Sequence, residues 1–438
     1  MQRDAARRRV MEAPALGAPP VPRVPRPERW TLSNGLRVVA VPRAAIPQVA
    51  LRLAVPVGSA ADPAQYPGTA GMVAALLTEG TLALDAEALN ARIDALGASV
   101  SAHAGHDHSE VEMTLLAGTL DEGIPLLAEL ATRPAFPEDE TERVRAEALD
   151  ALEARTDEPA NVADDRLLAE VFGADHPYGH PVFGTAEGVG SVPRAALEAF
   201  HRESFRPLGA YLVAAGDFDP AELRAVLERA FGGWTGRAPG VVYPPAPERP
   251  ARAGERVALP WEDSAQGEVR IGGVGLPRRS PDWIPAAVAN YVLGGSTILG
   301  RLGANLREDK GWTYGVRSGF SAGLEPGGWS AETAVAGEAT SDAVREMLAE
   351  IRRMTEEPVP EEELRRAKDA LVLSLPRAFE TPGRVASRFS TLEAYHLPHD
   401  YWERFPDRIA AVTPDEVLRV CRAYLDPARL VTVTVGGE

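Results

Sequence analysis

Seven histidines lie close together in the sequence in three groups, and histidines at such spacings can be ligands of one metal ion. His103, His106 and His108 form the pattern H-x-x-H-x-H, and on a strand His106 and His108 would share one face, as ligands of one ion must. His176 and His180 have the i, i+4 spacing of a metal-binding helix. A proline and a glycine lie between them and prevent a regular helix, so we expect no ligand role for this pair.

The remaining candidate residues give weaker signals. His396 and His399 flank a Leu-Pro step without an accompanying carboxylate pattern, so we expect surface residues. Cys421 is the one cysteine and can form neither an intramolecular disulfide nor a thiolate cluster. The run LGGST at 293–297 is placed like a phosphate-binding loop, but it lacks the P-loop lysine and the dinucleotide fingerprint. We expect a turn there, with its serine or threonine as a helix cap.

The overall composition is that of a globular protein. The chain has 438 residues, which at roughly 150 residues per domain corresponds to about two to four domains. Hydrophobic residues make up 45% and charged residues 25%, which excludes a disordered chain. The formal net charge of −17 disfavours a nucleic-acid-binding surface and favours basic or neutral partners.

No stretch of the sequence resembles a membrane anchor. No window reaches the roughly 18 consecutive apolar residues of a membrane-spanning helix. The N-terminal segment begins with an arginine cluster and becomes proline-rich without forming the apolar core of a signal peptide. We therefore expect a soluble protein with no membrane span, either cytoplasmic or, if a leader has been removed, periplasmic.

Hydrophobic periodicity and turn residues predict the elements of the first half. Asn34-Gly35 supply a positive-φ turn between two strands, a third strand follows, and the period then changes to that of helices. Asp85 is expected to cap one helix and Thr119 another. The expected strands lie within 30–41, 48–58, 99–118 and 210–216, and the expected helices cover 68–79, 85–96, 120–131, 138–155 and the segment from 220 onward.

The second half repeats this order. Strands are expected within 256–259, 267–274, 313–323 and 430–437, and helices over 282–293 and 297–309, with two further long helices before the last strand. The stretch AYLDPARLVTVTVGG echoes SFRPLGAYLVAAGDF of the first half. A period near 200 residues is too long for a solenoid. We therefore predict an α+β fold of two homologous, duplicated domains, each an antiparallel-rich β-sheet covered by α-helices.

Composition sets the predicted domain boundaries. Residues 1–27 read as a Pro-rich N-terminal arm, which cannot bury enough surface to order itself. Residues 235–255 have the Pro, Gly and Arg content of an exposed linker. The first α+β domain is therefore expected over 28–234 and the second over 256–438.

Five stretches of the sequence match one known family in order and spacing. They are LSNGLRVVAVP, GTAGMVAALLTEGT, HPYGHPVFGT, YLVAAGDF and LREDKGWTYGV. The chain resembles the pitrilysin/insulinase family of zinc metallopeptidases, the inverted zincins, from about Trp30 to its end. The resemblance implies a peptidase-like protein that encloses unfolded peptides. It also implies that 103–108 lie on a strand without a ligand role, so we expect ordinary sheet-surface residues there.

The family's catalytic motif has lost its reactive residues in this chain. That motif is H-x-x-E-H on a helix, in which two histidines bind zinc and the glutamate activates water. The surrounding frame, G-x-A before and G-T after, is intact, but the three motif positions are Gly71, Ala74 and Ala75. The third ligand of the family would fall within 150–153, where the match is loose. We expect no zinc site and no metal cofactor in this chain, and the resemblance implies that a partner subunit carries the zinc.

A second family pattern is intact. R-x-x-x-G-x-x-Y is matched by Arg307, Gly311 and Tyr314. In resembling enzymes this Arg and Tyr reach the zinc site and hold the substrate carbonyl oxygen, a role that suits donors aimed at developing negative charge. A helix over 297–309, ended by Gly311 and followed by a strand at Tyr314, would point both side chains into one cavity. The alternative is that Arg307 makes a surface ion pair and Tyr314 packs in the core.

These patterns together predict half of a composite active site. The resemblance implies the non-zinc subunit of a heterodimeric zinc metalloendopeptidase, in which Arg307 and Tyr314 act in trans on a homologous, zinc-bearing partner. Such a chain would be inactive alone. Two alternatives stay open, namely an inactive scaffold subunit and a chamber that binds peptides without hydrolysing them.

Overall fold

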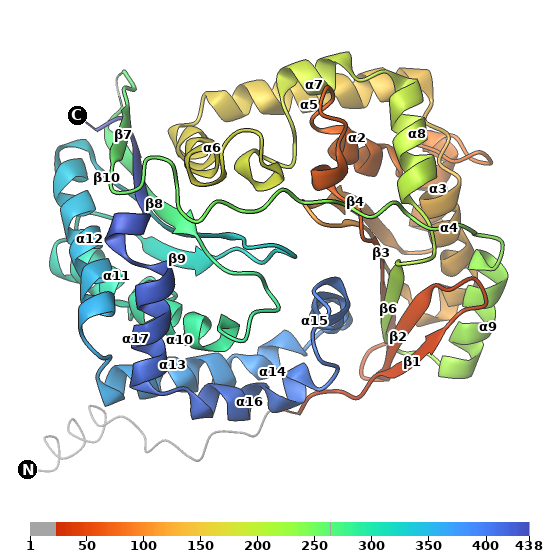
Figure 1. The fold of residues 1–438 in the computed structure, drawn as a ribbon. Helices are drawn as coiled ribbons and strands as arrows, with labels where there is room; N and C mark the ends of the chain where they lie inside the picture. Colours follow the sequence, from red (N-terminus) through yellow and green to blue (C-terminus); the bar gives the residue numbers. More distant parts are fainter. Residues whose placement is uncertain (1–22, 263, 438) are drawn as a thin grey trace, which may run out of the picture.

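The computed structural model describes residues 23–262 and 264–437, so most of the predicted arm, residues 1–27, lies outside the described part. The first half builds a six-stranded sheet in the order β1-β2-β6-β3-β5-β4 (Figure 1). Its β2 and β6 are parallel and its other neighbouring strands are antiparallel. The strands are β1 (Glu28–Thr31), β2 (Arg37–Pro42), β3 (Gln48–Val55), β4 (Ser99–Ala104), β5 (Ser109–Leu116) and β6 (Tyr211–Gly216).

Turn and cap residues explain where several of these elements begin and end. Gly35 adopts φ = 92° between β1 and β2, as the hairpin prediction requires. Asp85 accepts a hydrogen bond from the Ala88 amide at 2.8 Å and so caps α3, as predicted. The prediction for Thr119 was wrong, because its hydroxyl donates to carbonyl oxygens and accepts no bond from the helix that follows. The helices of this half are α2 (Thr69–Leu76), α3 (Ala86–Ala95), α4 (Leu120–Thr132), α5 (Glu138–Thr156), α6 (Pro159–Phe172), α7 (Ala186–Ser191), α8 (Arg194–Ser204) and α9 (Pro220–Phe231).

The second half repeats the sheet without its first strand. Its order is β7-β11-β8-β10-β9, again with one parallel pair, β7 with β11, in the place of β2 with β6. The strands are β7 (Arg256–Leu259), β8 (Gln266–Val274), β9 (Val316–Phe320), β10 (Gly328–Ala336) and β11 (Val431–Val435). The strand β11 occupies the position of β6, as the sequence echo between them predicted. The duplicated α+β fold is confirmed.

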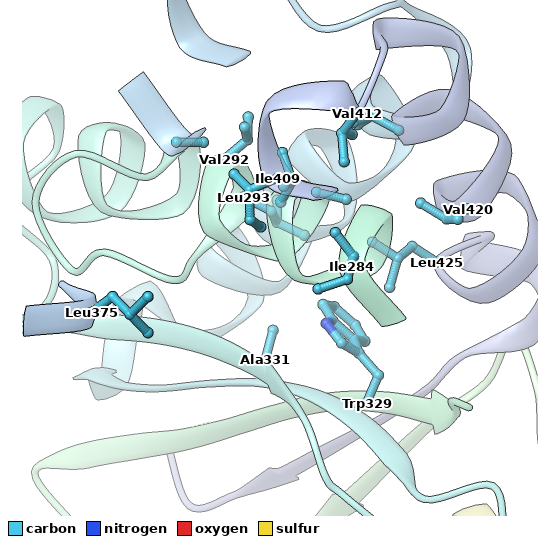
Figure 2. Close-up of a cluster of buried hydrophobic side chains, with 14 of the residues drawn as sticks. Ile284, Val292, Leu293, Trp329, Ala331, Leu375, Ile409, Val412, Val420 and Leu425 are labelled. Carbon is cyan, nitrogen blue, oxygen red and sulfur yellow. The ribbon is translucent and has the colours of Figure 1, made fainter. Parts of the chain in front are cut away.

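The second half of the chain contains more helices than expected. Two long helices were predicted before the last strand, and the chain forms six helices between β10 and β11. They are α12 (Thr340–Glu356), α13 (Glu361–Leu373), α14 (Leu375–Ala378), α15 (Pro382–Ala394), α16 (Tyr401–Ala411) and α17 (Pro414–Tyr424). Before them come α10 (Trp283–Leu293) and the short α11 (Arg301–Gly303). Figure 2 shows the core between these helices and the sheet, where Trp329 of β10, 1% exposed, lies beneath Ile284 of α10.

Each half places one helix on the sheet of the other half. The helix α6 packs on β8 and β11, where Leu167 lies so close to Gly272 that a Cβ atom at this glycine would meet it at 2.9 Å. The helix α15 packs on β3 and β6, and its Ser390 hydroxyl lies 3.0 Å from the Tyr211 hydroxyl. Figure 1 shows both helices between the sheet of the first half and the sheet of the second half. The two halves are therefore interlocked by helix exchange.

The helix exchange changes the expected result of limited proteolysis at the predicted linker. Residues 235–255 contain no helix or strand, and Val242 is 90% exposed, so we expect the first cut there. Because α6 and α15 are exchanged, the two fragments should stay together on a sizing column and separate in denaturant. Early cuts within 68–155 would show that the boundary is misplaced.

Candidate functional site

The three altered motif positions lie on α2, as the frame predicted. Gly71 and Ala75 line a cavity, whereas Ala74 is 1% exposed in the core of the first half. The helix begins after Gly68, at φ = 101°, which offers no side-chain cap. Asp62 from the preceding loop replaces the cap, since its carboxylate accepts from the amides of Gly68 at 2.7 Å and Ala70 at 2.8 Å.

The cavity beside α2 has a volume of about 660 Å³ and is mostly apolar. It is lined by residues of α2, β4, α5, the start of α6 and α7, and by the loop that contains Val182 and Phe183. Six of its eighteen lining residues are alanines. Neither Asp150 nor Glu153 lines it, although α5 contributes the residues between and beside them. The walls offer one histidine, His103, and one carboxylate, Glu158, and α2 adds no further donor, so the ligand set that a zinc ion needs is incomplete here.

One cluster of possible metal ligands lies beside the cavity within the described residues. His103, Glu110 and Glu112 bring three donor atoms within 4.8 Å of one another. Arg52 lies among them, donating to Glu110 at 3.0 Å and also to Glu112. The Glu110 carboxylate accepts a hydrogen bond from His103 and so raises the pKa of this histidine. A guanidinium already neutralises these carboxylates, so the cluster forms a charged network across β3, β5 and β4 and is a poor cation site.

The other two histidines of this stretch do not lie on a strand. The strand β4 ends at Ala104 and β5 begins at Ser109, so His106 and His108 belong to the connecting turn, which corrects the sheet-surface expectation. His106 hydrogen-bonds the Ser59 hydroxyl at 3.1 Å, and burial lowers its pKa to about 4. His108 lies 3.2 Å from the Ala394 carbonyl oxygen of the second half. His108 is therefore part of the packing between the halves, whereas His106 packs within the first half, with its ring centre 5.2 Å from that of Tyr178.

The turn also carries a buried acid that the sequence analysis missed. Asp107 is 4% exposed and accepts hydrogen bonds from the hydroxyls of Tyr178 and Tyr243, both at 2.7 Å, and from the Leu324 amide at 2.9 Å. Burial and the carboxylate raise the pKa of both tyrosines, which keeps them protonated as donors. Asp107 thus ties the first half, the linker and the second half together.

The remaining histidines agree with the sequence analysis. His176 begins a 3-10 turn, Pro177–Gly179, and stacks on Phe172 with ring centres 5.2 Å apart, so no metal-binding helix forms with His180. His396 and His399 are exposed.

The loop at 293–297 also forms the expected turn. Within it the Ser296 hydroxyl accepts a hydrogen bond from the Leu299 amide at 3.1 Å. The helix after this turn starts only at Arg301, so the serine stabilises the turn and does not cap a helix.

Arg307 and Tyr314 lie together on the outer part of the second half. Arg307 lies in a π-helical turn, Ala304–Asp309, in place of the expected regular helix over 297–309. Gly311, at φ = 64°, ends the turn, and Tyr314 lies two residues before β9. The guanidinium carbon of Arg307 lies 5.6 Å from the centre of the Tyr314 ring, a cation–π contact. Tyr314 is 93% exposed, which excludes core packing of this residue. The other part of the alternative is present, since Arg307 forms a surface ion pair with Glu308 at 3.5 Å.

A polar network fixes this π-helical turn. Asn305 donates to Glu350, which is 7% exposed, at 3.0 Å and to Glu346 at 3.1 Å, and it accepts from the Lys310 ammonium at 2.6 Å. The Lys310 amide closes the π-type bond to the Asn305 carbonyl at 3.1 Å. The sequence analysis missed these residues, since a π-turn has no propensity signal. The network holds the backbone that presents Arg307 and Tyr314.

Comparison with known proteins agrees with this arrangement of fold and motifs. The model of the insulinase family, peptidase family M16, matches residues 37–186, which include the altered motif, and the model of the peptidase M16 inactive domain matches residues 191–371. The chain belongs to peptidase family M16. Within this family, its first half has the M16 frame without the M16 zinc ligands, and its second half resembles the inactive type of domain.

Individual M16 relatives cover nearly the whole chain. An uncharacterized zinc protease of Mycobacterium tuberculosis is 29% identical over 401 residues, which are 91% of each chain. One of Streptomyces coelicolor is 26% identical and covers 91% of this chain and 87% of its own. A crystal structure of a peptidase M16 inactive domain from Pseudomonas fluorescens has a TM-score of 0.87 at 23% identity, covering 94% of this chain and 98% of that one. This likeness supports the two-domain M16 fold.

The helices of this chain are too short or too polar to cross a membrane, as far as residues 23–262 and 264–437 are concerned.

The cap of α2 gives a pH-dependent prediction. Burial raises the pKa of Asp62 from 3.8 to about 7, against its backbone hydrogen bonds. Between these two values the folded chain holds a proton that the unfolded chain releases, so the contribution of Asp62 to the unfolding free energy decreases as the pH rises from about 4 to about 7. Asp62→Asn removes this dependence. The difference in unfolding free energy, wild type minus variant, should fall with pH by at most about 1.4 kcal/mol per unit in denaturant titrations. Parallel pH profiles would contradict the prediction.

Proposed function

We propose that this chain is the non-zinc subunit of a heterodimeric zinc metalloendopeptidase and supplies Arg307 and Tyr314 to a partner that carries H-x-x-E-H. One observation carries the proposal. An exposed tyrosine lies against an arginine on a turn held by a buried polar network, while α2 contains no histidine, cysteine or carboxylate. A chain that served only as a scaffold would have no use for that pair.

The chemistry follows from the two donors. Zinc in the partner supplies an activated water for peptide hydrolysis. Attack on the scissile carbonyl develops negative charge on its oxygen, and the Arg307 guanidinium and the Tyr314 hydroxyl donate hydrogen bonds to that oxygen. Because the network around Asn305 holds the turn that presents these donors, they stabilise the developing oxyanion more than the neutral carbonyl and so lower the barrier. The net charge of −17 favours basic or neutral peptides as substrates.

Reconstitution tests the proposal. This chain is mixed with a homologous subunit that has an intact H-x-x-E-H, for example one encoded by a neighbouring reading frame. We expect a 1:1 complex on a sizing column, and cleavage of unstructured peptides by the mixture but by neither chain alone. A stable complex whose partner is equally active without this chain would favour the scaffold alternative.

A further inference from the structure

A second cavity lies on the outer face of the first half, between α4 and α9. It has a volume of about 670 Å³, which is in the range of pockets that hold small molecules. Figure 1 shows both helices on the side of the first half that faces away from the second half. The helix α4 packs on the face of the first sheet opposite to the face that α15 covers. This cavity is therefore separate from the site formed by Arg307 and Tyr314.

Three arginines from three segments of the chain border this cavity. Arg133 directly follows α4, Arg206 lies in the loop after α8, and Arg229 lies on α9. Within the described part of the chain, neither Arg133 nor Arg206 has a carboxylate at ion-pair distance. Arg229 has one, since Asp121 lies 3.9 Å away, but both side chains of this pair are exposed and such a pair contributes little. All three guanidiniums are therefore able to bind an anion.

The glutamates of the two helices are bonded elsewhere. On α4, Glu122 accepts a hydrogen bond from Arg92 at 2.5 Å. Glu129 of the same helix accepts one from the Thr81 hydroxyl at 3.0 Å. On α9, Glu228 accepts from an amide and a hydroxyl of the turn between β1 and β2, at 3.1 and 2.9 Å. Because none of these glutamates lines the cavity, the charges at its border are mostly positive, in a chain whose formal net charge is −17.

The cavity also has an apolar floor and one arginine that is held in place. Ala128, Val226 and Trp234 line it and are buried, and the indole N–H of Trp234 already donates to a backbone carbonyl oxygen at 2.9 Å. The half-buried Arg206 donates one of its five N–H groups to the Thr235 carbonyl oxygen at 3.1 Å, which fixes the guanidinium and leaves donors for a ligand. Partial burial strengthens its attraction for an anion, because less water screens the charge.

We propose that this cavity binds a small organic phosphate ester, with the phosphate among the three arginines and the apolar part of the molecule on Trp234. A phosphate group has three oxygens that accept hydrogen bonds in different directions, so arginines on different walls can bind it together. A planar carboxylate instead matches the fork of a single guanidinium. The apolar floor favours an organic ester over inorganic phosphate, because burying its apolar part adds to the affinity. The site belongs to this chain alone and does not depend on the proposed function.

Calorimetric titration of the full chain without a partner tests the proposal, with phenyl phosphate, inorganic phosphate, phthalate and phenol as probes. We expect one phenyl phosphate per chain, bound more tightly than each of the other three probes and less tightly at high ionic strength. No saturable binding of phenyl phosphate would overturn the proposal. Equal or tighter binding of phthalate would overturn its phosphate part, and equal or tighter binding of inorganic phosphate or phenol would overturn the combination of phosphate and apolar group.

Matched variants assign the binding to the cavity. Arg229→Gln and Arg224→Gln remove the same charge from exposed positions of α9, but only Arg229 lines the cavity. Because a hydrogen bond to a charged group is lost, we expect about a tenfold weaker affinity for phenyl phosphate in Arg229→Gln and in Arg206→Gln, and little change in Arg224→Gln. Equal losses in Arg229→Gln and Arg224→Gln would overturn the assignment.

Discussion

Tyr314→Phe should lower kcat of the reconstituted complex by about 10²- to 10³-fold and change KM much less. The variant deletes one donor to the oxyanion, and the loss of such a donor typically costs about 2.7–4 kcal/mol in the transition state. The ring stays in place over Arg307, and since it is 93% exposed its hydroxyl has no packing role. Steady-state kinetics with several peptides measures the effect.

Two controls make this result specific. Sizing must show that the variant complex assembles, because a failure to pair would imitate a catalytic defect. Arg307→Lys keeps the charge but loses the planar fork, so it should not restore full activity. Wild-type kcat for Tyr314→Phe in an assembled complex would contradict the role of Tyr314 and favour the scaffold alternative.

Asp107→Ala should produce the largest loss of stability among single changes outside the hydrophobic core. It leaves the hydroxyls of Tyr178 and Tyr243 and the Leu324 amide without their acceptor. A fully buried donor without a partner costs about 1–3 kcal/mol. Because Tyr243 and Leu324 are only half-buried and can reach water, we expect the three donors together to cost about 2–6 kcal/mol in urea denaturation. Because the contacts join the two halves, the variant should also expose the linker to faster proteolysis.

A double-mutant cycle separates this effect from a general packing defect. Tyr243→Phe should destabilise the wild type measurably and the Asp107→Ala background little, because the bond it removes is already lost there. Equal costs in both backgrounds would show that the two side chains do not interact energetically.

Local signals in the sequence were sufficient for much of the fold. The turn at Asn34-Gly35 and the cap at Asp85 are decided by backbone chemistry within a few residues, and both predictions are confirmed. The duplication was visible because β6 and β11 have the same pattern and, in the structure, the same place in their sheets. The intact frame around Gly71 located α2 for the same reason, since the frame residues shape the helix whether or not the ligands are present.

Features that depend on distant contacts could not be predicted. The helix α6 was missed, and its exchange with α15 depends on apolar faces that meet only across the two halves. Residues 304–309 have ordinary helical propensity, and their π-turn arises from the contacts of Asn305 with Glu346 and Glu350 on α12. Asp107 was expected on a strand and gave no signal of its own, because its three donors come from three separate segments of the chain.

The zinc content of each subunit in the reconstituted complex is the most direct test of a divided active site. After dialysis, and after separation of the chains, elemental analysis should find one zinc per heterodimer, all of it in the partner and none above the buffer blank in this chain. Gly71 and Ala75 provide no ligand and Ala74 no general base, so the chain alone should also lack peptidase activity. Stoichiometric zinc in this chain, together with chelator-sensitive cleavage in the absence of the partner, would contradict the account.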